Sequence, residues 1–152
     1  MFEADVALLT PVPEHHLISA EKLCQTTGFV TFGTGAIETL SKFDNLIGKD
    51  SRATVLIYAS MSTISGVPKV SYTARFEKFV GAKSDGTAPD DFSKYRPPST
   101  FGDGKWQSFY VVSNLTKLAN PIDIKTLNKH RAKGTFKADF IPQGPIIIAN
   151  PF

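Results

Sequence analysis

The chain has 152 residues, of which 41% are hydrophobic and 20% are charged. This size and composition predict one domain over residues 1–152 with a substantial core, and they exclude a disordered or membrane-embedded chain. No apolar run approaches the ~18–20 residues of a transmembrane helix, and no secretory signal is visible. Because Cys24 is the single cysteine, an internal disulfide is excluded, and we expect a cytoplasmic protein.

The formal net charge of +3 is unevenly distributed along the chain. Residues 1–50 carry seven acidic side chains and three lysines, whereas residues 51–152 carry fourteen basic and seven acidic side chains. Residues 117–137 alone hold six basic side chains and one acid. Such a stretch is a candidate surface for an anionic partner, although a solvated lysine-rich face is an equally good interpretation.

Hydrophobic spacing and turn residues predict many short strands and few helices. Pro11 and Pro13 should end the first strand, because proline lacks the N–H that a strand ladder needs. Thr34, or Gly35 together with Glu38, should start the second helix. In chain order we expect a strand at residues 4–10, a helix at 14–26, a strand at 28–33, a helix at 34–47, a strand at 54–60, one or two strands at 69–80, a strand pair or long strand at 105–118, a short helix at 121–128, and closing segments at 134–141 and 145–149.

Residues 81–104 are polar and rich in Gly, Pro, Ser and Asp, which predicts a long irregular loop of the kind that is usually functional or mobile. Tyr95, Arg96 and Phe101 in this loop could cover a pocket, enter a duplex, or belong to a plain surface excursion. The many closely spaced strands, with two or three helices, predict an α+β fold. We expect a small, strongly bent mixed β-barrel with flanking helices packed outside it.

The most informative stretch runs from Gly28 to Val80, as a strand, a Gly-Thr-Gly corner, a helix, a buried strand, a turn and a longer strand. The corner should leave free backbone N–H groups at a helix start, which suits an oxygen-rich or planar ligand. We find no catalytic signature, no nuclease motif and no phosphate-binding GxxxxGK[ST] loop. The sequence therefore favours a binding module over an enzyme.

Three segments also carry a family resemblance that spans most of residues 28–130. Their order resembles the PUA-like superfamily, and within it the EVE and YTH branches. The segments are Phe32-Gly33-Thr34-Gly35 before the second helix, then Val55-Leu56-Ile57-Tyr58-Ala59-Ser60 with Gly66-Val67 and Tyr72-Thr73-Ala74-Arg75-Phe76, and then Trp106-Gln107-Ser108-Phe109-Tyr110-Val111-Val112 followed by Leu118, Pro121-Ile122, Ile124 and Leu127.

The resemblance implies a small β-barrel with a pocket for one modified nucleobase, held between aromatic side chains and read by backbone groups. In prokaryotes such domains are often specificity modules of modification-dependent restriction systems. The tryptophan that YTH-type domains carry near the first corner is absent here, so Phe29 or Phe32 would have to take its place.

Six residues are candidates for binding a flipped base. Trp106 follows a polar turn at a strand start, where its indole could stack on a base for ~1–3 kcal/mol or could simply close the rim of the barrel. Glycines flank Thr34 and permit close approach, although a plain helix cap beside a core phenylalanine is the alternative. Ser60 is more simply the end of a buried strand. The candidates are Phe32, Gly33, Thr34, Ser60, Tyr95 and Trp106.

Four basic residues are candidates for phosphate contacts, which would be salt-dependent and independent of base sequence. No metal site is expected, because the adjacent His15 and His16 do not share a helix face. Cys24 is expected in the core, and no cofactor is predicted. The phosphate candidates are Lys125, Lys129, Arg131 and Lys133.

The leading hypothesis is a DNA-binding module, with DNA favoured over RNA, that recognises a modified base after base flipping. It would be the specificity domain of a restriction or defence system, with the nuclease or ATPase motor on another domain or partner. One alternative is a small-ligand-binding protein or hydrolytic enzyme that uses the same barrel pocket. Another is a protein-interaction or structural subunit, which the twelve phenylalanines would suit.

Overall fold

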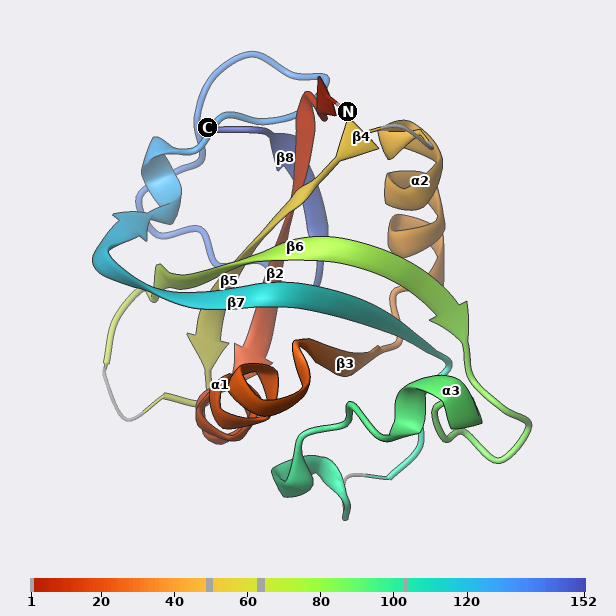
Figure 1. Cartoon of the computed structure of the whole chain (residues 1–152). Coiled ribbons are helices and arrows are strands. Elements are labelled where there is room, and N and C mark those ends of the chain that lie inside the picture. The colour runs from red at the N-terminus through yellow and green to blue at the C-terminus, as the bar shows by residue number, and fades with distance from the viewer. Residues whose placement is uncertain (1, 49–50, 63–64, 103) are drawn as a thin grey trace.

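One mixed sheet of six strands runs through the molecule in the order β3-β7-β6-β5-β2-β8 (Figure 1). The computed structural model describes residues 2–48, 51–62, 65–102 and 104–152. Strands β2 and β5 are parallel, and the other neighbours in this sheet are antiparallel. The strands are β2 (Val6–Pro13), β3 (Phe29–Thr34), β5 (Thr54–Ser60), β6 (Lys69–Gly81), β7 (Ser108–Asp123) and β8 (Ile146–Ala149).

The remaining elements are short apart from two helices. A second, parallel pair of two-residue strands joins β1 to β4. Helix α1 follows β2 directly, and α2 lies between β3 and β4 in the chain. These elements are β1 (Phe2–Glu3), β4 (Ser51–Arg52), α1 (Glu14–Thr27), α2 (Ile37–Ile47), α3 (Asp90–Ser93) and the 3₁₀ turns η1 (Pro98–Thr100) and η2 (Ile124–Thr126).

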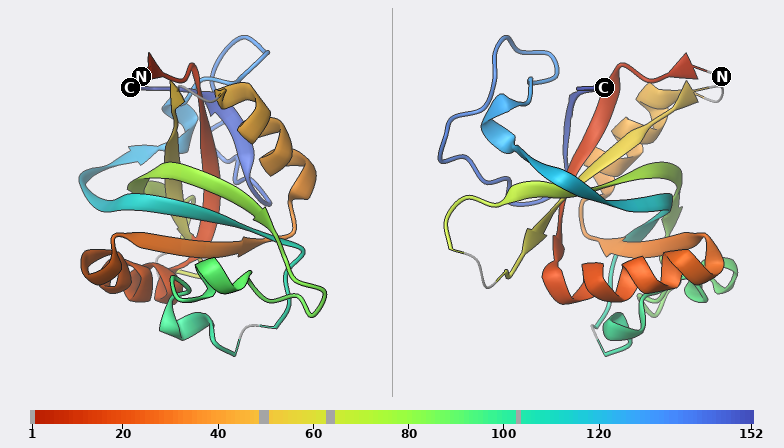
Figure 2. Two further views of the ribbon diagram at one scale, coloured as in Figure 1. Left: turned by 45° about the vertical axis from the view of Figure 1, so that its right-hand side comes forward. Right: turned by 60° about the vertical axis from the view of Figure 1, so that its left-hand side comes forward.

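The six-stranded sheet is curled into a half-barrel. Its two longest strands, β6 and β7, lie across the direction of β2 and β5 in all three views (Figures 1 and 2). The β6–β7 ladder contains three register shifts, the first between Val70 and Tyr72, and such irregularities bend paired strands. Because β3 and β8 are the two ends of the strand order, the half-barrel is open. The predicted α+β class, with a strongly bent mixed sheet and outer helices, is confirmed at this level.

Both faces of the sheet are buried at its centre. In β5, Val55 and Ile57 belong to one core, and Leu56 and Tyr58 belong to the other. The first core also takes side chains from α1 and α2, whereas η2 and the segment 136–140 cover the second. A large apolar side chain contributes ~1.5–3 kcal/mol when it is fully buried, so the continuous apolar run of β5 supports both cores.

The first strand does not end where its prolines were expected to end it. Strand β2 continues through Pro11 and Pro13, which lie opposite Tyr58 and Ser60 of β5. Strand β8 pairs with β2 only between Val6 and Leu9, so the other edge of β2 is open beside the prolines. A proline on an open edge removes no ladder hydrogen bond, which explains why the prediction was wrong.

One expectation for the last third of the chain was also wrong. Strand β7 extends to Asp123, so the helix expected at residues 121–128 is reduced to the single turn η2. The closing segment expected at 134–141 contains no strand and takes part, through Thr135, in an isolated bridge to Asn128. The closing segment expected at 145–149 is confirmed as β8.

Candidate functional site

A cleft of about 530 Å³ lies where the carboxyl ends of β2 and β3 meet the loop between β6 and β7. We call it the β2–β3 cleft. A second cleft, of about 570 Å³, lies between α1 and the β5–β6 connection, and no predicted base-binding residue is among those that line it. Ligand pockets have volumes of ~300–1,000 Å³, so both clefts are large enough to hold a ligand. We choose the first as the candidate site because it contains predicted base-binding residues. Those that line the β2–β3 cleft are Phe32, Gly33, Thr34, Ser60 and Trp106.

Trp106 lies flat against the backbone of β3. A Cβ atom placed on Gly33 would come within 2.5 Å of Cγ and Cδ1 of the indole, so only glycine fits beneath the ring. The backbone N–H of Trp106 donates to the carbonyl oxygen of Gly86 at 3.0 Å, which fixes the chain at this point. The side chain is still 36% exposed, so part of its ring is available beside the cleft.

Phe32 forms an inner wall of the β2–β3 cleft and is almost completely buried. Its ring centroid lies 5.6 Å from that of Tyr110 in a tilted contact. The Tyr110 hydroxyl is hydrogen-bonded with Thr10, which also lines the cleft, and burial raises the pKa of Tyr110 to about 12. This part of the wall is therefore apolar, with a neutral phenol behind it at physiological pH.

The Gly-Thr-Gly corner differs in detail from its prediction. Helix α2 begins at Ile37 without a side-chain cap, so neither Thr34 nor the Gly35–Glu38 pair starts it. Instead, the Thr34 hydroxyl accepts the N–H of Ala36 at 3.0 Å, and the N–H of Ile37 donates to the carbonyl of Gly35. Two N–H groups that were expected to be free at this corner are thus already bonded within it.

His16 brings a titratable ring to the cleft from the first turns of α1. The side chain is buried, and its Nδ1 lies 2.7 Å from the hydroxyl oxygen of Ser99 in η1. The Ser99 backbone N–H also donates to the Ser19 hydroxyl at 3.3 Å. These contacts tie the loop between β6 and β7 to α1.

Arg96 is the second basic group of the cleft and comes from the long loop. Its Nη1 donates to the carbonyl oxygen of Thr31 at 3.0 Å, and its guanidinium lies 5.2 Å from the centroid of the Phe109 ring. Among the described residues that line the cleft, no side chain is acidic. The charge of the site therefore favours neutral or anionic ligands over cations.

Tyr95 does not line the β2–β3 cleft. Its ring lies 5.3 Å from that of Phe29, outside the barrel, with the ammonium group of Lys94 above it at 5.2 Å. Its carbonyl oxygen accepts the N–H of Thr31 at 2.8 Å. The structure gives Tyr95 the role of an anchor between the long loop and β3.

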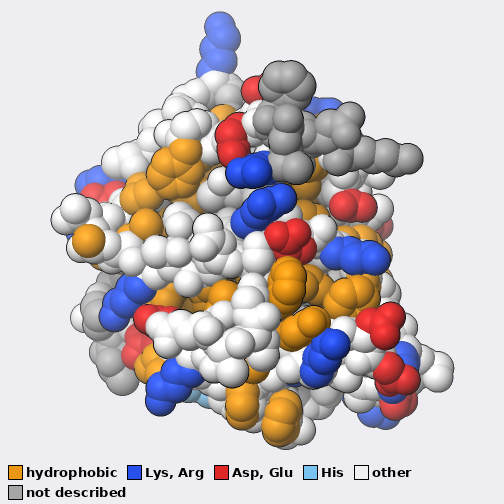
Figure 3. Space-filling model, in the orientation of Figure 1, with side chains coloured by type: hydrophobic (Ala, Val, Ile, Leu, Met, Phe, Trp, Pro, Cys, Tyr) orange, Lys and Arg blue, Asp and Glu red, His pale blue; other side chains and the backbone are white. Residues whose placement is uncertain are grey.

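The four predicted phosphate residues also lie away from the cleft. The segment 124–137 lies near the chain termini at one end of the sheet, whereas the loop between β6 and β7 lies at the other end (Figures 1 and 2). The ammonium of Lys129 is 5.9 Å from the Phe136 ring, and Arg131 lines a shallow groove along α2. Lys125 and Lys133 are exposed. On the face drawn in Figure 3, basic and acidic side chains are interspersed.

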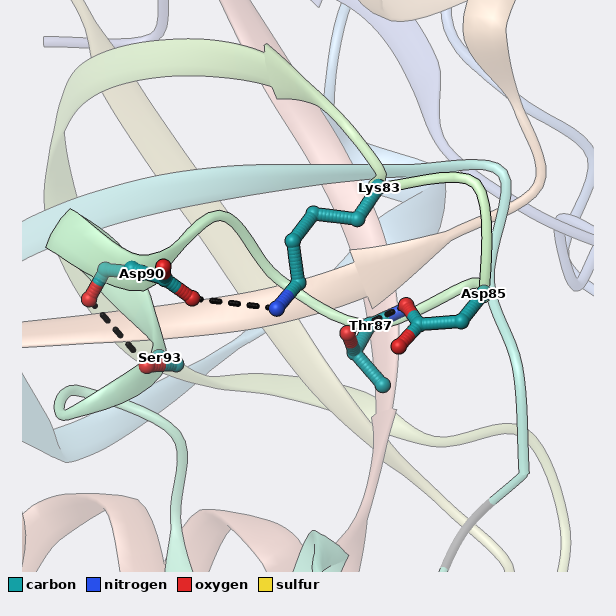
Figure 4. A network of polar contacts seen from close by, with 5 residues as sticks. All are labelled: Lys83, Asp85, Thr87, Asp90 and Ser93. Atoms are coloured by element: carbon teal, nitrogen blue, oxygen red, sulfur yellow. Dashed lines mark hydrogen bonds and ion pairs between the residues drawn. The ribbon is translucent and has the colours of Figure 1, made fainter.

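A polar network shapes the other half of the long loop (Figure 4). Lys83 donates to Asp90 at 3.0 Å, which raises the pKa of the lysine. The side chain and the N–H of Thr87 donate to Asp85 and lower the pKa of that carboxyl group. This network sets two carboxylates against one ammonium group, and none of its residues lines the cleft.

Within the described part of the chain, no group of three or more His, Cys, Asp or Glu side chains could hold a metal ion. Cys24 is a buried free thiol of α1, as expected for a core residue. No helix among residues 2–48, 51–62, 65–102 and 104–152 is long and apolar enough to cross a membrane.

Sequence reasoning missed the groups that line the cleft from distant elements. Thr10, His16 and Gln143 reach it only because β2, α1 and the segment before β8 fold together. No local motif marks these positions. Arg96 was noticed in the long loop, but its contact with Thr31 of β3 was not predictable from spacing.

Comparison with known proteins adds little to this picture. No family model matches the chain, and no curated protein matches it. A crystal structure of a structural-genomics target protein from Pseudomonas putida is similar over 76% of this chain and 71% of that chain, with 19% identity and a TM-score of 0.43.

Proposed function

We propose that this chain is a DNA-binding module that accepts one flipped, modified base in the β2–β3 cleft. In this proposal it is the PUA-like, EVE-type specificity domain of a modification-dependent restriction or defence system. The domain itself is not the enzyme, and a nuclease or motor acts from another domain or partner. A cytoplasmic location follows from that role.

One observation carries the proposal: a partly exposed tryptophan lies beside a cleft of the size of a ligand pocket. Trp106 is held against Gly33 by close packing, so its ring orientation is fixed before any ligand arrives. A preorganised aromatic face can stack on any base, and each such stacking contact is worth ~1–3 kcal/mol. Extrusion of a base costs a few kcal/mol, which the cleft must offset.

The charge of the cleft supports a nucleic-acid ligand. The guanidinium of Arg96 lines it, and none of the described lining side chains is a carboxylate. Polar groups from Thr10, Ser60 and Gln143 could read the edge of a base that Trp106 holds.

The first test is fluorescence anisotropy with matched DNA duplexes at two salt concentrations. The duplexes are unmodified or carry methylcytosine, hydroxymethylcytosine or N6-methyladenine at one position. We expect one modified duplex to bind more tightly. Trp106→Ala should weaken its binding by about 5- to 150-fold, which corresponds to the loss of one stacked base. Trp106→Phe is the matched control and should retain most of the affinity.

The predicted phosphate contacts have their own test. Lys125 and Lys133 are exposed but lie at the other end of the sheet from the cleft, so this test asks whether a duplex bound at the cleft also reaches them. If it does, changing both to Gln should reduce the slope of log affinity against log salt by about one unit per lost contact. Preference for the modified duplex should be unchanged. Equal weak binding of the wild-type protein to all duplexes, or no binding, would overturn the proposed function.

A hydrolytic enzyme is the second candidate, and the contact between His16 and Ser99 is the observation that favours it. A hydroxyl 2.7 Å from an imidazole nitrogen is the arrangement of a nucleophile and its base. However, the N–H groups of Thr100 and Phe101 donate to the carbonyls of Pro97 and Pro98 and are not available to an oxyanion. Labelling of the wild-type protein, but not of Ser99→Ala, by a fluorophosphonate probe would favour this candidate over the base reader.

A further inference from the structure

Phe101 is an unusually exposed aromatic side chain beside the β2–β3 cleft. It is 77% exposed, although the preceding residue, Thr100, is 7% exposed and lines the cleft. Trp106 lies five residues further along the same loop. Phe101 itself does not line the cleft, but both Thr100 before it and Trp106 after it do, so the exposed ring is carried by a segment that borders the cleft.

The backbone that carries Phe101 is held at several points. The Phe101 N–H donates to the carbonyl of Pro98, and the Thr100 hydroxyl donates to the carbonyl of Pro97 at 2.6 Å. The contact of Ser99 with His16 ties the same turn to α1. Phe101 is therefore a projecting side chain on a fixed turn, not the tip of a free loop.

Earlier in the loop, further contacts fix it to β3. Thr31 donates its N–H to the carbonyl of Tyr95 and its hydroxyl to the carbonyl of Phe92. At the base of the loop, Ala82 donates to the carbonyl of Gln107 at 3.2 Å. The loop is therefore hydrogen-bonded to β3, which forms a wall of the cleft, and the turn that carries Phe101 is hydrogen-bonded to α1, so both anchors lie beside the cleft.

From this geometry we infer that Phe101 is a wedge that enters the DNA duplex and fills the space left by the flipped base. The inference rests on the proposed function and specifies its partner as a double strand. A base that leaves the stack exposes the faces of its neighbours, and an apolar side chain inserted there replaces the lost stacking. An exposed ring one residue from the cleft-lining Thr100 could stay in the duplex while the base lies in the cleft.

The inference makes double-stranded and single-stranded DNA respond differently to one substitution. A single strand has no partner strand and needs little unstacking, so a wedge contributes nothing to its binding. Phe101→Ala should weaken binding to the modified duplex about tenfold, because the inserted ring replaces the stacking that the flipped base gives up. It should change binding to the modified single strand by less than about twofold.

The experiment is fluorescence anisotropy with the modified duplex and its modified single strand, for wild type, Phe101→Ala, Phe101→Leu and Phe152→Ala. Phe152 is the matched control, since it is 69% exposed and lies at the other end of the molecule (Figure 1). Phe101→Leu keeps an apolar wedge and should retain most of the duplex affinity. A 2-aminopurine next to the modified base should brighten with wild type and less with Phe101→Ala.

The possible results separate the two proposals. If wild type prefers the modified duplex and Phe101→Ala binds it equally well, the wedge is overturned and the base reader stands. Equal loss on duplex and single strand also overturns the wedge, because Phe101 would then act within the base site. If wild type prefers no modified DNA, the proposed function fails and the wedge fails with it.

Discussion

The indole of Trp106 and the backbone of Gly33 are in direct contact, and no larger residue at position 33 leaves the ring in place. A Cβ atom there would lie 2.5 Å from two indole carbons and 2.7 Å from a third. Gly33, which the sequence places in the Gly-Thr-Gly corner as a site of close approach, therefore acts as a platform for an aromatic ring. The packing joins β3 to the end of the long loop, 73 residues further along the chain.

This contact predicts that Gly33→Ala displaces the indole into solvent. The neighbouring atoms belong to a side chain, so we expect the ring to move and the backbone of β3 to stay. Because Trp106 is the single tryptophan, intrinsic fluorescence reports on it alone, and its emission should shift to the red. Binding to the modified duplex should fall as it does for Trp106→Ala.

Gly35→Ala is the matched control for this prediction. A Cβ atom at Gly35 would meet nothing within 4 Å, although the residue belongs to the same corner and lines the same cleft. Its fluorescence spectrum should match that of wild type. An unshifted spectrum for Gly33→Ala would show that the ring is not held by this contact.

Elements with strong local periodicity were predictable from the sequence. Strand β5 and helix α1 have nearly the expected bounds. A strand buried on both faces is a continuous apolar run, and a helix buried along one side has apolar residues at helical spacing, so both can be recognised in the sequence. The extension of β2 through Pro11 and Pro13 was not predictable. It depends on where β8 stops pairing, and β8 is more than 130 residues away in sequence.

The candidate site likewise contains some residues that could be predicted from the sequence and others that could not. Phe32, Gly33 and Thr34 are neighbours in sequence, so a local motif could place them together. Arg96 and His16 join them through contacts with Thr31 and Ser99, and such long-range contacts have no local signature. Conversely, the basic residues of 125–133 are close in sequence but lie away from the cleft.

We predict that Arg96→Gln destabilises the protein by about 1–3 kcal/mol. The substitution removes a charge-assisted hydrogen bond to the Thr31 carbonyl and the contact with the Phe109 ring, both at a half-buried position. Urea denaturation gives the change in the free energy of unfolding. Lys94→Gln is the control, since Lys94 lies over an aromatic ring but is exposed, and it should lose less than about 1 kcal/mol. Equal losses would contradict the assignment.

Three buried tyrosines predict a loss of stability at alkaline pH, and one of them is Tyr72, whose pKa is raised by burial and by its hydrogen bond to Glu21. Burial raises the pKa of Tyr58 and of Tyr110 from 10.0 to about 12, and Tyr58 also donates to the carbonyl of Pro142. The unfolded chain loses these protons first, so the stabilisation is complete below pH 10 and is lost as the pH rises towards 12. Tyr58 and Tyr110 should each account for ~2–3 kcal/mol over this window.

Urea denaturation between pH 9 and pH 12 checks this prediction, with tyrosinate absorbance as an independent readout. Tyr58→Phe removes one of the three groups and should make the decline shallower. It should also cost about 1–3 kcal/mol at pH 8, because the Pro142 carbonyl loses its donor. If the free energy of unfolding of this variant declines as steeply with pH as that of wild type, Tyr58 is excluded as a source of the pH dependence.

His130 predicts a second pH dependence, of opposite sign. Its Nε2 is buried and has no hydrogen-bond partner among the described residues. Burial lowers the pKa of the imidazole, and the charges of Arg131 and Lys42 lower it further. Folding therefore favours the neutral ring, whereas the unfolded chain takes up a proton near its ordinary pKa of 6.5.

The free energy of unfolding should consequently fall as the pH decreases from 7.5 to 5.5. His130→Gln removes the titrating ring and should flatten this dependence, which thermal unfolding at four or five pH values would show. His15→Gln changes an exposed histidine of α1 and serves as the control. If both variants keep the wild-type dependence, the loss of stability has another source, and burial of the His130 ring has no measurable effect on folding.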